Sequence, residues 1–187
     1  MKKSRTPKAV NAAWDVIVKS MKALSDEDRD APLAQDLFHI MGSIKGATLL
    51  ANKRGLDPEI VTIAMILHDL GRIPTGVFEG HDIAGAPVVK KIMQRIGEFT
   101  QEEIDLVVRL TRTHRQKDQK GDLYEECIRD ADILDIYLSG IAGWQRPMEP
   151  HRERLEKLAK ELGFKIIETE PDESRGRARH RDQKGQG

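Results

Sequence analysis

The sequence is poor in cysteine, in aromatic residues and in long apolar runs, and it carries no net charge. Its one cysteine, Cys127, excludes an internal disulfide framework and is typical of a reducing compartment. No apolar run approaches the roughly 18 to 20 residues that a membrane-spanning helix needs. The basic start, residues 1–5, is not followed by the apolar stretch of a signal peptide. We therefore predict a soluble, cytoplasmic protein without a membrane partner.

The balance of charge restricts the partners further. Thirty-one basic residues offset thirty-one acidic ones, so the formal net charge is zero. Proteins that bind long nucleic acids usually present a basic surface to the phosphate backbone. We therefore expect no long nucleic acid as a partner, and a phosphorylated partner must be bound by a local site.

The low aromatic content, 4% of residues, leaves the core to Leu, Ile, Ala and Met, which favour helices. The length of 187 residues suits one ordinary domain that buries a real core. We predict an all-α fold, a compact bundle of about six to eight helices in residues 1–167. Residues 168–187 are charged and lack apolar periodicity, so we predict a disordered tail there.

The most informative stretch is an apolar segment that begins at Asp57 and Pro58 and ends at His68 and Asp69. Asp57 is a good N-cap, and Pro58 suits the first helical position because its missing N–H has no intrahelical partner there. The β-branched run Ile-Val-Thr-Ile would suit a strand, but the Asp-Pro start and the length favour a helix. We expect Gly71 to end this helix in the left-handed conformation. The apolar residues on every side predict a helix packed all round in the middle of the domain.

Helical periodicity and capping signals predict six more helices. They cover residues 6–24, 32–54, 81–97, 100–115, 122–140 and 150–162, and residues 72–80 are predicted to form a loop. In the first helix an apolar stripe recurs at helical spacing and is expected to pack against the core: Val10, Trp14, Ile17, Val18, Met21 and Leu24. Thr100 and Glu103 have the spacing of a capping box.

His39 lies in the helix predicted for residues 32–54, and three small residues share its face. Gly42, Ser43 and Gly46 follow it at plus three, plus four and plus seven. Small residues let a neighbouring helix come close, which a ligand needs if it is to share an ion with another helix. A tight helix crossing beside a bystander histidine explains the pattern equally well.

A carboxylate at the end of an apolar helix needs a cation or several donors, because burying it alone costs several kcal/mol. A metal ion would satisfy His68 and Asp69 together, whereas a core histidine beside a solvated aspartate is the plainer alternative. Six candidate ligands stand at predicted helix faces or ends: His39, His68, Asp69, His81, His114 and Asp132. Imidazole and carboxylate together suit divalent transition metals such as Fe, Mn, Co, Ni or Zn.

The order of these ligands resembles the HD-domain phosphohydrolase superfamily, whose pattern is a His, a His-Asp pair and a distant Asp. Residues 68–72, His-Asp-Leu-Gly-Arg, are similar to the family's His-Asp-Ile-Gly-Lys signature with two conservative changes. Residues 131–134, Ala-Asp-Ile-Leu, are similar to its last ligand motif, which favours Asp132 over Asp130. The resemblance spans residues 36–140 or so and implies the HD-type helical fold.

Two further histidines, His81 and His114, resemble those of members that hold two metals. Residues 80–86 are similar to the His-x-x-x-Gly-Ala stretch of that dinuclear subset. The resemblance implies one or two divalent transition-metal ions, with one ion held by His39, His68 and Asp132, the other by His81 and His114, and Asp69 as the bridge. It implies a metal-dependent phosphohydrolase that cleaves a phosphoester or phosphoanhydride bond of a nucleotide-like small molecule with metal-activated water.

Three other residues receive roles from this reading. Arg72 occupies the position of the signature lysine, and its planar guanidinium can grip two phosphate oxygens. Arg115, next to a proposed ligand, is a second substrate-binding candidate. Asp135 or water would donate the proton to the leaving group.

Two alternatives share the same residues. Some dinuclear HD-like proteins are oxygenases that use a mixed-valent iron pair, and degenerate HD-like domains serve as non-catalytic regulatory modules. Such modules would be expected to have lost ligands, whereas this chain keeps all six types in order. The sequence also leaves room for a homodimer.

Overall fold

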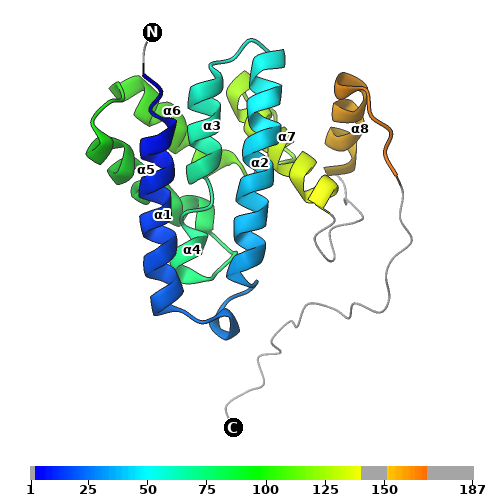
Figure 1. The fold of residues 1–187 in the computed structure, drawn as a ribbon. Coiled ribbons are helices and arrows are strands. Elements are labelled where there is room, and N and C mark those ends of the chain that lie inside the picture. The colour runs from blue at the N-terminus through cyan, green and yellow to red at the C-terminus, as the bar shows by residue number, and fades with distance from the viewer. Residues whose placement is uncertain (1–2, 140–150, 168–187) are drawn as a thin grey trace.

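The computed structural model describes residues 3–139 and 151–167 (Figure 1). Its helices follow in the order α1 (Thr6–Ala23), the 3-10 helix η1 (Asp26–Asp28), α2 (Leu33–Lys53), α3 (Pro58–Leu67), α4 (Arg72–Thr75), α5 (His81–Ile96), α6 (Gln101–Thr113), α7 (Leu123–Ser139) and α8 (His151–Leu162). No strand occurs in the two described ranges. The predicted all-α fold is confirmed. The predicted tail, residues 168–187, lies outside the described residues, and the domain limits stay a prediction.

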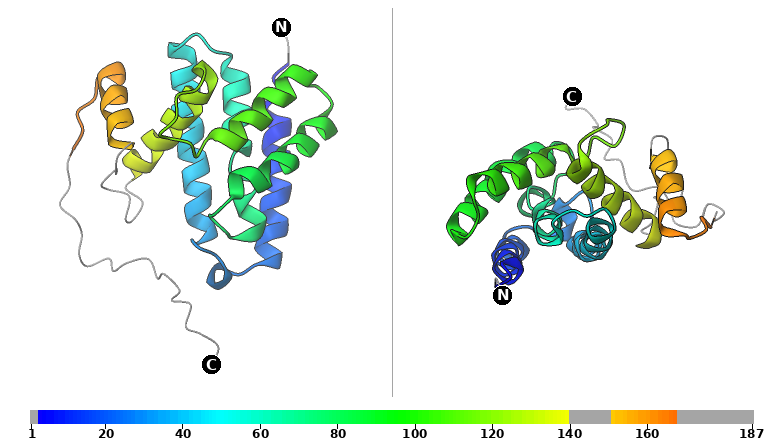
Figure 2. Two further views of the ribbon diagram at one scale, coloured as in Figure 1. Left: turned by 180° about the vertical axis from the view of Figure 1, so that it is seen from behind. Right: turned by 90° about the horizontal axis from the view of Figure 1, so that it is seen from above.

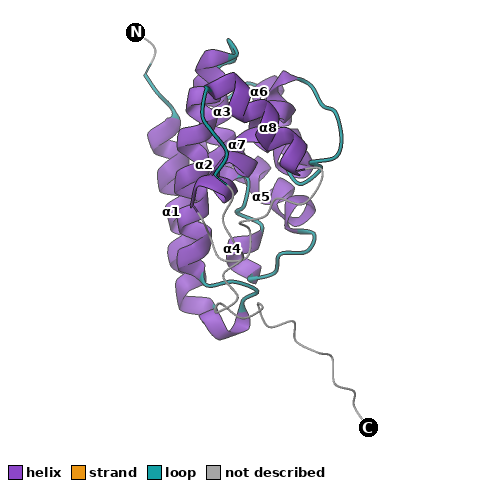
Figure 3. Cartoon of the chain, turned by 90° about the vertical axis from the view of Figure 1, so that its right-hand side faces the viewer, coloured by secondary structure: helices purple, strands orange, loops and turns teal. Residues whose placement is uncertain are grey.

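The helices form two layers, and α3 lies in the middle of one of them (Figure 2). Seen from above, α1, α3 and α2 make one row, and α5, α6 and α7 lie behind it (Figure 2). The side view shows the same separation, with α1 and α2 on one side and α5 and α6 on the other (Figure 3). Helix α8 packs against α7 at the edge of the bundle. Among the described residues, no helix has both the length and the apolar character that a membrane span requires.

Helix α3 is the centre of the core, as its apolar sequence predicts. It contacts α1, α2, α6 and α7, and seven of its ten residues are buried. Asp57 caps its start by accepting hydrogen bonds from the backbone N–H groups of Glu59 and Ile60. Because the helix is buried to its last residue, it delivers His68 and Asp69 to the interior of the bundle.

The predicted packing face of α1 is only partly confirmed, because Ile17 is buried as predicted but three of its larger residues are exposed. Val10, Trp14 and Met21 are 46%, 55% and 58% exposed, and the core face consists of Ala9, Ala13, Ile17 and Ser20. Both stripes repeat with the helical period, so periodicity alone does not separate them. The smaller residues face the core because they let α1 pack closely against its neighbours.

The turn around Gly71 also differs from the prediction. Gly71 has a right-handed φ of −72°, and the left-handed glycine is Gly76, which ends α4. Part of the predicted loop is therefore helical, since residues 72–75 form α4. Glycine is needed at position 71 for another reason: a Cβ there would collide with the backbone of His81 and Gly85 at the start of α5.

The crossing of α2 and α7 is as tight as the small residues of α2 predict. A Cβ on Gly42 would collide with the carboxylate of Asp135, and one on Gly46 would lie 3.6 Å from the Leu134 side chain. The close approach at Gly42 and Gly46 fixes α2 against α7, the two helices that carry His39 and Asp132.

The predicted capping box is also present, since Thr100 and Glu103 exchange hydrogen bonds at the start of α6.

Candidate metal centre

The six predicted ligands meet inside the bundle. They come from separate elements: His39 from α2, His68 and Asp69 from the turn after α3, His81 from the start of α5, His114 from the end of α6 and Asp132 from α7. All except His39 are buried, with at most 5% of each residue exposed. The structure therefore brings together every residue of the predicted set.

Asp69 lies at the middle of the cluster, and its two oxygens face different histidine pairs. Oδ1 is 2.9 Å from His81 Nε2 and 3.5 Å from His114 Nε2. Oδ2 is 3.4 Å from His68 Nε2 and 3.8 Å from His39 Nε2. A carboxylate between two sets of nitrogen ligands has the arrangement of a bridge between two cations.

Three histidines are oriented by carbonyl groups of their own chain segment. In each case Nδ1 donates a hydrogen bond of 2.6 to 2.8 Å to the carbonyl oxygen three residues earlier: His68 to Met65, His81 to Phe78 and His114 to Thr111. A carbonyl cannot donate, so Nδ1 must carry the proton. In the neutral form of such a ring Nε2 carries no proton, so its lone pair faces the centre and can bind a metal ion.

Two of these carbonyls belong to the last turns of helices. Met65 lies in the last turn of α3 and Thr111 in the last turn of α6, where backbone carbonyls have no intrahelical partner. The histidine that follows each helix satisfies such a group. Both helices also direct the negative end of their dipole toward the centre, which favours a cation there.

His68 gives the clearest sign that a cation belongs in this cluster. Its Nε2 is buried and has no hydrogen-bond partner among the described residues. Burial lowers the pKa of His68 to about 4, so the ring is neutral at physiological pH. A buried acceptor without a partner is costly, and a metal ion would satisfy this nitrogen.

The acids of the cluster are ionised. Burial would raise the pKa of Asp69, but the surrounding histidines hold it well below its ordinary value. Burial likewise opposes ionisation of Asp132, and the charge of Lys117 holds its pKa well below the usual range. Asp132 Oδ1 lies 3.0 Å from His39 Nε2. Burial would lower the pKa of His39, but hydrogen bonds to Asp132 and Asp135 raise it to about 10, so a cation bound there must displace a proton.

Within the described residues, two groups of side chains have the spacing of a metal site: His39 with His68 and Asp69, and Asp69 with His81 and His114. In each group the potential ligand atoms lie within 4.8 Å of one another, and Asp69 belongs to both. Asp132 adjoins the first group through His39. Imidazoles with carboxylates fit a divalent transition metal, whereas calcium or magnesium would want mostly oxygen.

Comparison with models of known families identifies the family of this chain. The model of the HD domain matches residues 37–137, more than half of the chain. The protein belongs to the HD domain family. Searches of curated proteins and of solved structures found no match. The family and the cluster of His and Asp residues are together consistent with a metal-dependent hydrolase.

The two predicted substrate arginines of the HD domain both lie over one aromatic ring, that of Phe78. The guanidinium carbon of Arg72 is 5.0 Å from the centroid of Phe78, and that of Arg115 is 4.6 Å from it. Both pair with acids rather than with the six ligands: Arg72 with Asp36 at 3.0 Å, and Arg115 with Glu79 at 3.2 Å. The backbone carbonyl of Phe78 accepts the hydrogen bond that orients His81. Phe78 therefore contacts both arginines through its ring and a proposed metal ligand through its backbone.

Asp36 is a buried acid that the sequence reading missed. It is 3% exposed, and its Oδ2 has no hydrogen-bond partner among the described residues. Burial raises the pKa of Asp36 to about 6, although the charge of Arg72 opposes the shift. Asp36 precedes His39 by three residues on α2, and this same-face spacing is the signal that could have revealed it.

Asp36→Asn is expected to stabilise the protein above pH 6. The carboxyl binds its proton more tightly in the folded state than in the unfolded state, where its pKa is near 3.8. Its contribution to stability is therefore present below pH 4 and is lost as the pH rises through about 6. Neutral Asn avoids this loss, which is about 3 kcal/mol at most for a shift of this size. Urea unfolding at pH 5 and pH 8 measures it, and a gain that is equal at both values would contradict the assignment.

Asp135 has a different place from the one predicted for a proton donor. Its Oδ2 accepts a hydrogen bond of 2.8 Å from His39 Nδ1, on the side of the ring opposite to Nε2. Gly42 leaves the space for this carboxylate. We therefore interpret Asp135 as a residue that orients a ligand, and its role as the proton donor stays a prediction.

Asp135→Asn is expected to weaken binding of Mn²⁺ by about 10- to 100-fold, the usual cost of losing a partner that orients a metal ligand. The cause is a less basic His39 ring that no longer has an anionic acceptor. Calorimetric titration of the metal-free protein measures the effect. Asp105→Asn, an exposed acid of α6, is the matched control and should bind Mn²⁺ as the wild type does. Equal affinity of the two variants would show that Asp135 does not orient His39.

Proposed function

We propose that this HD domain protein is a metal-dependent phosphohydrolase that cleaves a phosphoester or phosphoanhydride bond of a nucleotide-like small molecule. The observation that carries the proposal is the position of Asp69, whose two oxygens face two separate histidine pairs. The Nε2 of His68 supports it, because this buried atom has no hydrogen-bond partner in the described part of the chain and a cation would provide one. Both features suit a pair of divalent cations better than a hydrogen-bonded core.

The chain would hold the two ions with six side chains. His39, His68 and Asp132 serve one position, His81 and His114 the other, and Asp69 both. When bound, a pair of divalent cations would activate a water molecule as the nucleophile and supply positive charge to the phosphoryl oxygens. The carbonyl groups behind His68, His81 and His114, with Asp135 behind His39, keep the four rings in place throughout turnover.

Arg72 and Arg115 are proposed to bind the phosphate of the substrate. Each guanidinium offers several N–H donors in one plane, which matches two phosphate oxygens. Both guanidinium groups lie over the ring of Phe78, which restricts the two side chains. The present partners, Asp36 for Arg72 and Glu79 for Arg115, keep the two charges in place before the substrate binds.

The substrate is proposed to be small. The ligand cluster lies inside the bundle, with Asp69 3% exposed and His68 1% exposed, so a phosphate group on a small molecule suits it better than a polymer. A nucleotide-like compound is preferred to a long nucleic acid because the formal net charge of the chain is zero, so it has no overall excess of basic charge for a phosphate backbone.

The test is a screen of substrates with the protein purified without chelator. Phosphomonoesters, cyclic nucleotides and dinucleotides are incubated with Mn, Fe, Co, Ni or Zn, and phosphate release and oxygen uptake are both recorded. We expect metal-dependent phosphate release without oxygen consumption. Oxygen uptake without phosphate release would favour an oxygenase with the same ligands. Metal binding no tighter than that of His68→Ala would favour a non-catalytic module.

A further inference from the structure

Lys117 brings a positive charge into the centre. It lies on the loop between α6 and α7 and is only 7% exposed. Its ammonium forms an ion pair with Asp132 Oδ2, while the other oxygen of Asp132 faces His39 Nε2 at 3.0 Å. The charge therefore stands directly behind one of the proposed ligands.

An ammonium group is rarely buried without a reason, because its desolvation is costly. A flexible lysine on a polar loop would normally extend into water. Something must therefore hold this loop in the conformation that directs Lys117 inward.

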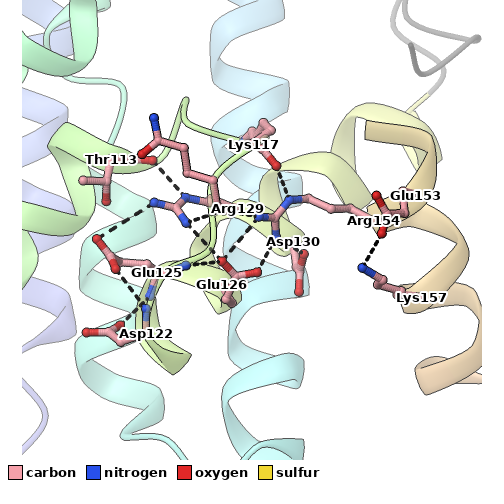
Figure 4. A network of polar contacts seen from close by, with 12 residues as sticks. Thr113, Lys117, Asp122, Glu125, Glu126, Arg129, Asp130, Glu153, Arg154 and Lys157 are labelled. Atoms are coloured by element: carbon pink, nitrogen blue, oxygen red, sulfur yellow. Dashed lines mark hydrogen bonds and ion pairs between the residues drawn. The ribbon is translucent and has the colours of Figure 1, made fainter. Parts of the chain in front are cut away.

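Two arginines, the buried Arg129 and the half-buried Arg154, hold the backbone of the loop (Figure 4). Arg129 donates to the carbonyls of Thr113 at 3.0 Å and Gln119 at 3.1 Å. Arg154 donates to the carbonyl of Lys117 itself at 2.5 Å and to that of Gln119 at 2.8 Å. The arginines thus hold the chain at the end of α6, at Lys117 and at Gln119.

Arg154 belongs to α8, which lies outside the residues 37–137 that match the HD domain. Glu126 and Asp130 of α7 hold its guanidinium at 2.6 and 3.2 Å. Leu155 and Leu158 are buried, so α8 is packed against the bundle and is not a loose appendage. A helix beyond the family core therefore fixes the position of Lys117.

We propose that Lys117 is a substrate-binding residue whose ammonium donates to a phosphoryl oxygen of a substrate bound beside Asp69, and that Arg154 positions it. The inference rests on the proposed phosphohydrolase function. Four buried carboxylates surround the site: Asp36, Asp69, Asp132 and Asp135. An anionic substrate that approaches them needs a cation of the protein close to the reacting group. Lysine offers three donors, and the contact with Asp132 occupies one of them.

A counterion for Asp132 alone is the competing explanation for Lys117. In that case removing the Lys117 side chain would change the stability of the protein or its affinity for metal. The affinity for phosphate would then fall only because less metal is bound. The two roles are separated by measuring the binding of inorganic phosphate to protein already saturated with Mn²⁺. This measurement does not depend on turnover or on knowledge of the substrate.

Lys117→Met is expected to weaken the binding of inorganic phosphate to the Mn²⁺-saturated protein by about 10- to 100-fold, the range for losing one hydrogen bond to a charged group. Lys120→Met is the matched control, because it removes the same charge from an exposed position on the same loop. We expect its phosphate affinity to stay within about twofold of the wild type. Titration calorimetry gives the affinities, and metal analysis gives the Mn²⁺ content of each variant.

A second variant covers the case in which Lys117→Met does not fold. Lys117→Gln keeps a donor for Asp132 but removes the charge, and it should lose phosphate affinity to a similar extent. Arg154→Met tests the role of α8, with Lys157→Met, an exposed residue of the same helix, as its control. We expect about a 3- to 10-fold loss for Arg154→Met, since Lys117 remains but is less well held.

The outcomes distinguish the role of Lys117 in substrate binding from the proposed phosphohydrolase function. If Lys117→Met and Lys117→Gln bind Mn²⁺ and phosphate as the wild type does, Lys117 does not bind the substrate, while the phosphohydrolase function stands. If they bind less metal and phosphate affinity falls only in proportion, Lys117 is a counterion. If the wild type itself binds no Mn²⁺, the proposed function fails first.

Discussion

Asp69→Ala is expected to lower phosphohydrolase activity by at least about 10³-fold, more than the loss of one oxyanion-stabilising donor usually costs. The reason is that both histidine pairs face this one carboxylate, so its removal weakens two metal positions together. Metal analysis of the purified variant should show less than the wild-type content. Initial rates with the best substrate of the screen measure the loss.

The matched control is Asp15→Ala, which removes an exposed acid from α1. Its rate and metal content should equal those of the wild type. Asp69→Asn keeps the shape of the side chain and should also be inactive, because a neutral amide is a poor ligand for two cations. Turnover by Asp69→Ala within tenfold of the wild type would refute the bridging role.

Gly71→Ala is expected to destabilise the protein by about 3 kcal/mol or more, at the upper end of the range for overpacking. A Cβ at this position would meet the backbone of His81 and Gly85, and backbone atoms cannot move aside as a flexible side chain can. The start of α5 would have to shift, and His81 would move with it. Urea unfolding gives the change in free energy, and Mn²⁺ titration should show weaker binding.

Gly46→Ala is the control for this substitution. A Cβ at position 46 would lie 3.6 Å from the Leu134 side chain, which is ordinary van der Waals contact. Alanine also suits the interior of a helix better than glycine, by up to about 1 kcal/mol. Gly46→Ala should therefore be neutral or stabilising. A similar free energy of unfolding for both variants would mean that the turn after α3 does not approach α5 as closely as the structure has it.

Most of the fold could be predicted from local signals. The cap at Asp57, the capping box at Thr100 and the apolar run of α3 each act within a few residues, and all three are confirmed. The face of α1 and the conformation of Gly71 could not be predicted, because both depend on which element lies opposite. A helical stripe gives the same period whether or not it is buried, and a glycine gives no sign of whether it serves a turn or a close approach.

The ligand set of the site could be predicted because it follows a family pattern with fixed spacing. The residues around the ligands could not, since Lys117 and Arg154 reach the centre only through tertiary contacts between the loop, α7 and α8. Asp135 shows the same limit. Its sequence position suggested an acid near the reaction, and only the crossing of α2 and α7 shows that it holds His39.

The central claim is that the residues around Asp69 bind cations, and anomalous diffraction from crystals grown with Mn²⁺ tests it most directly. The account predicts anomalous peaks on both sides of the Asp69 carboxylate, one within coordination distance of His39, His68 and Asp132 and the other beside His81 and His114. Mn²⁺ bound elsewhere, with no peak at Asp69 and Nε2 of His68 still without a partner, would contradict it.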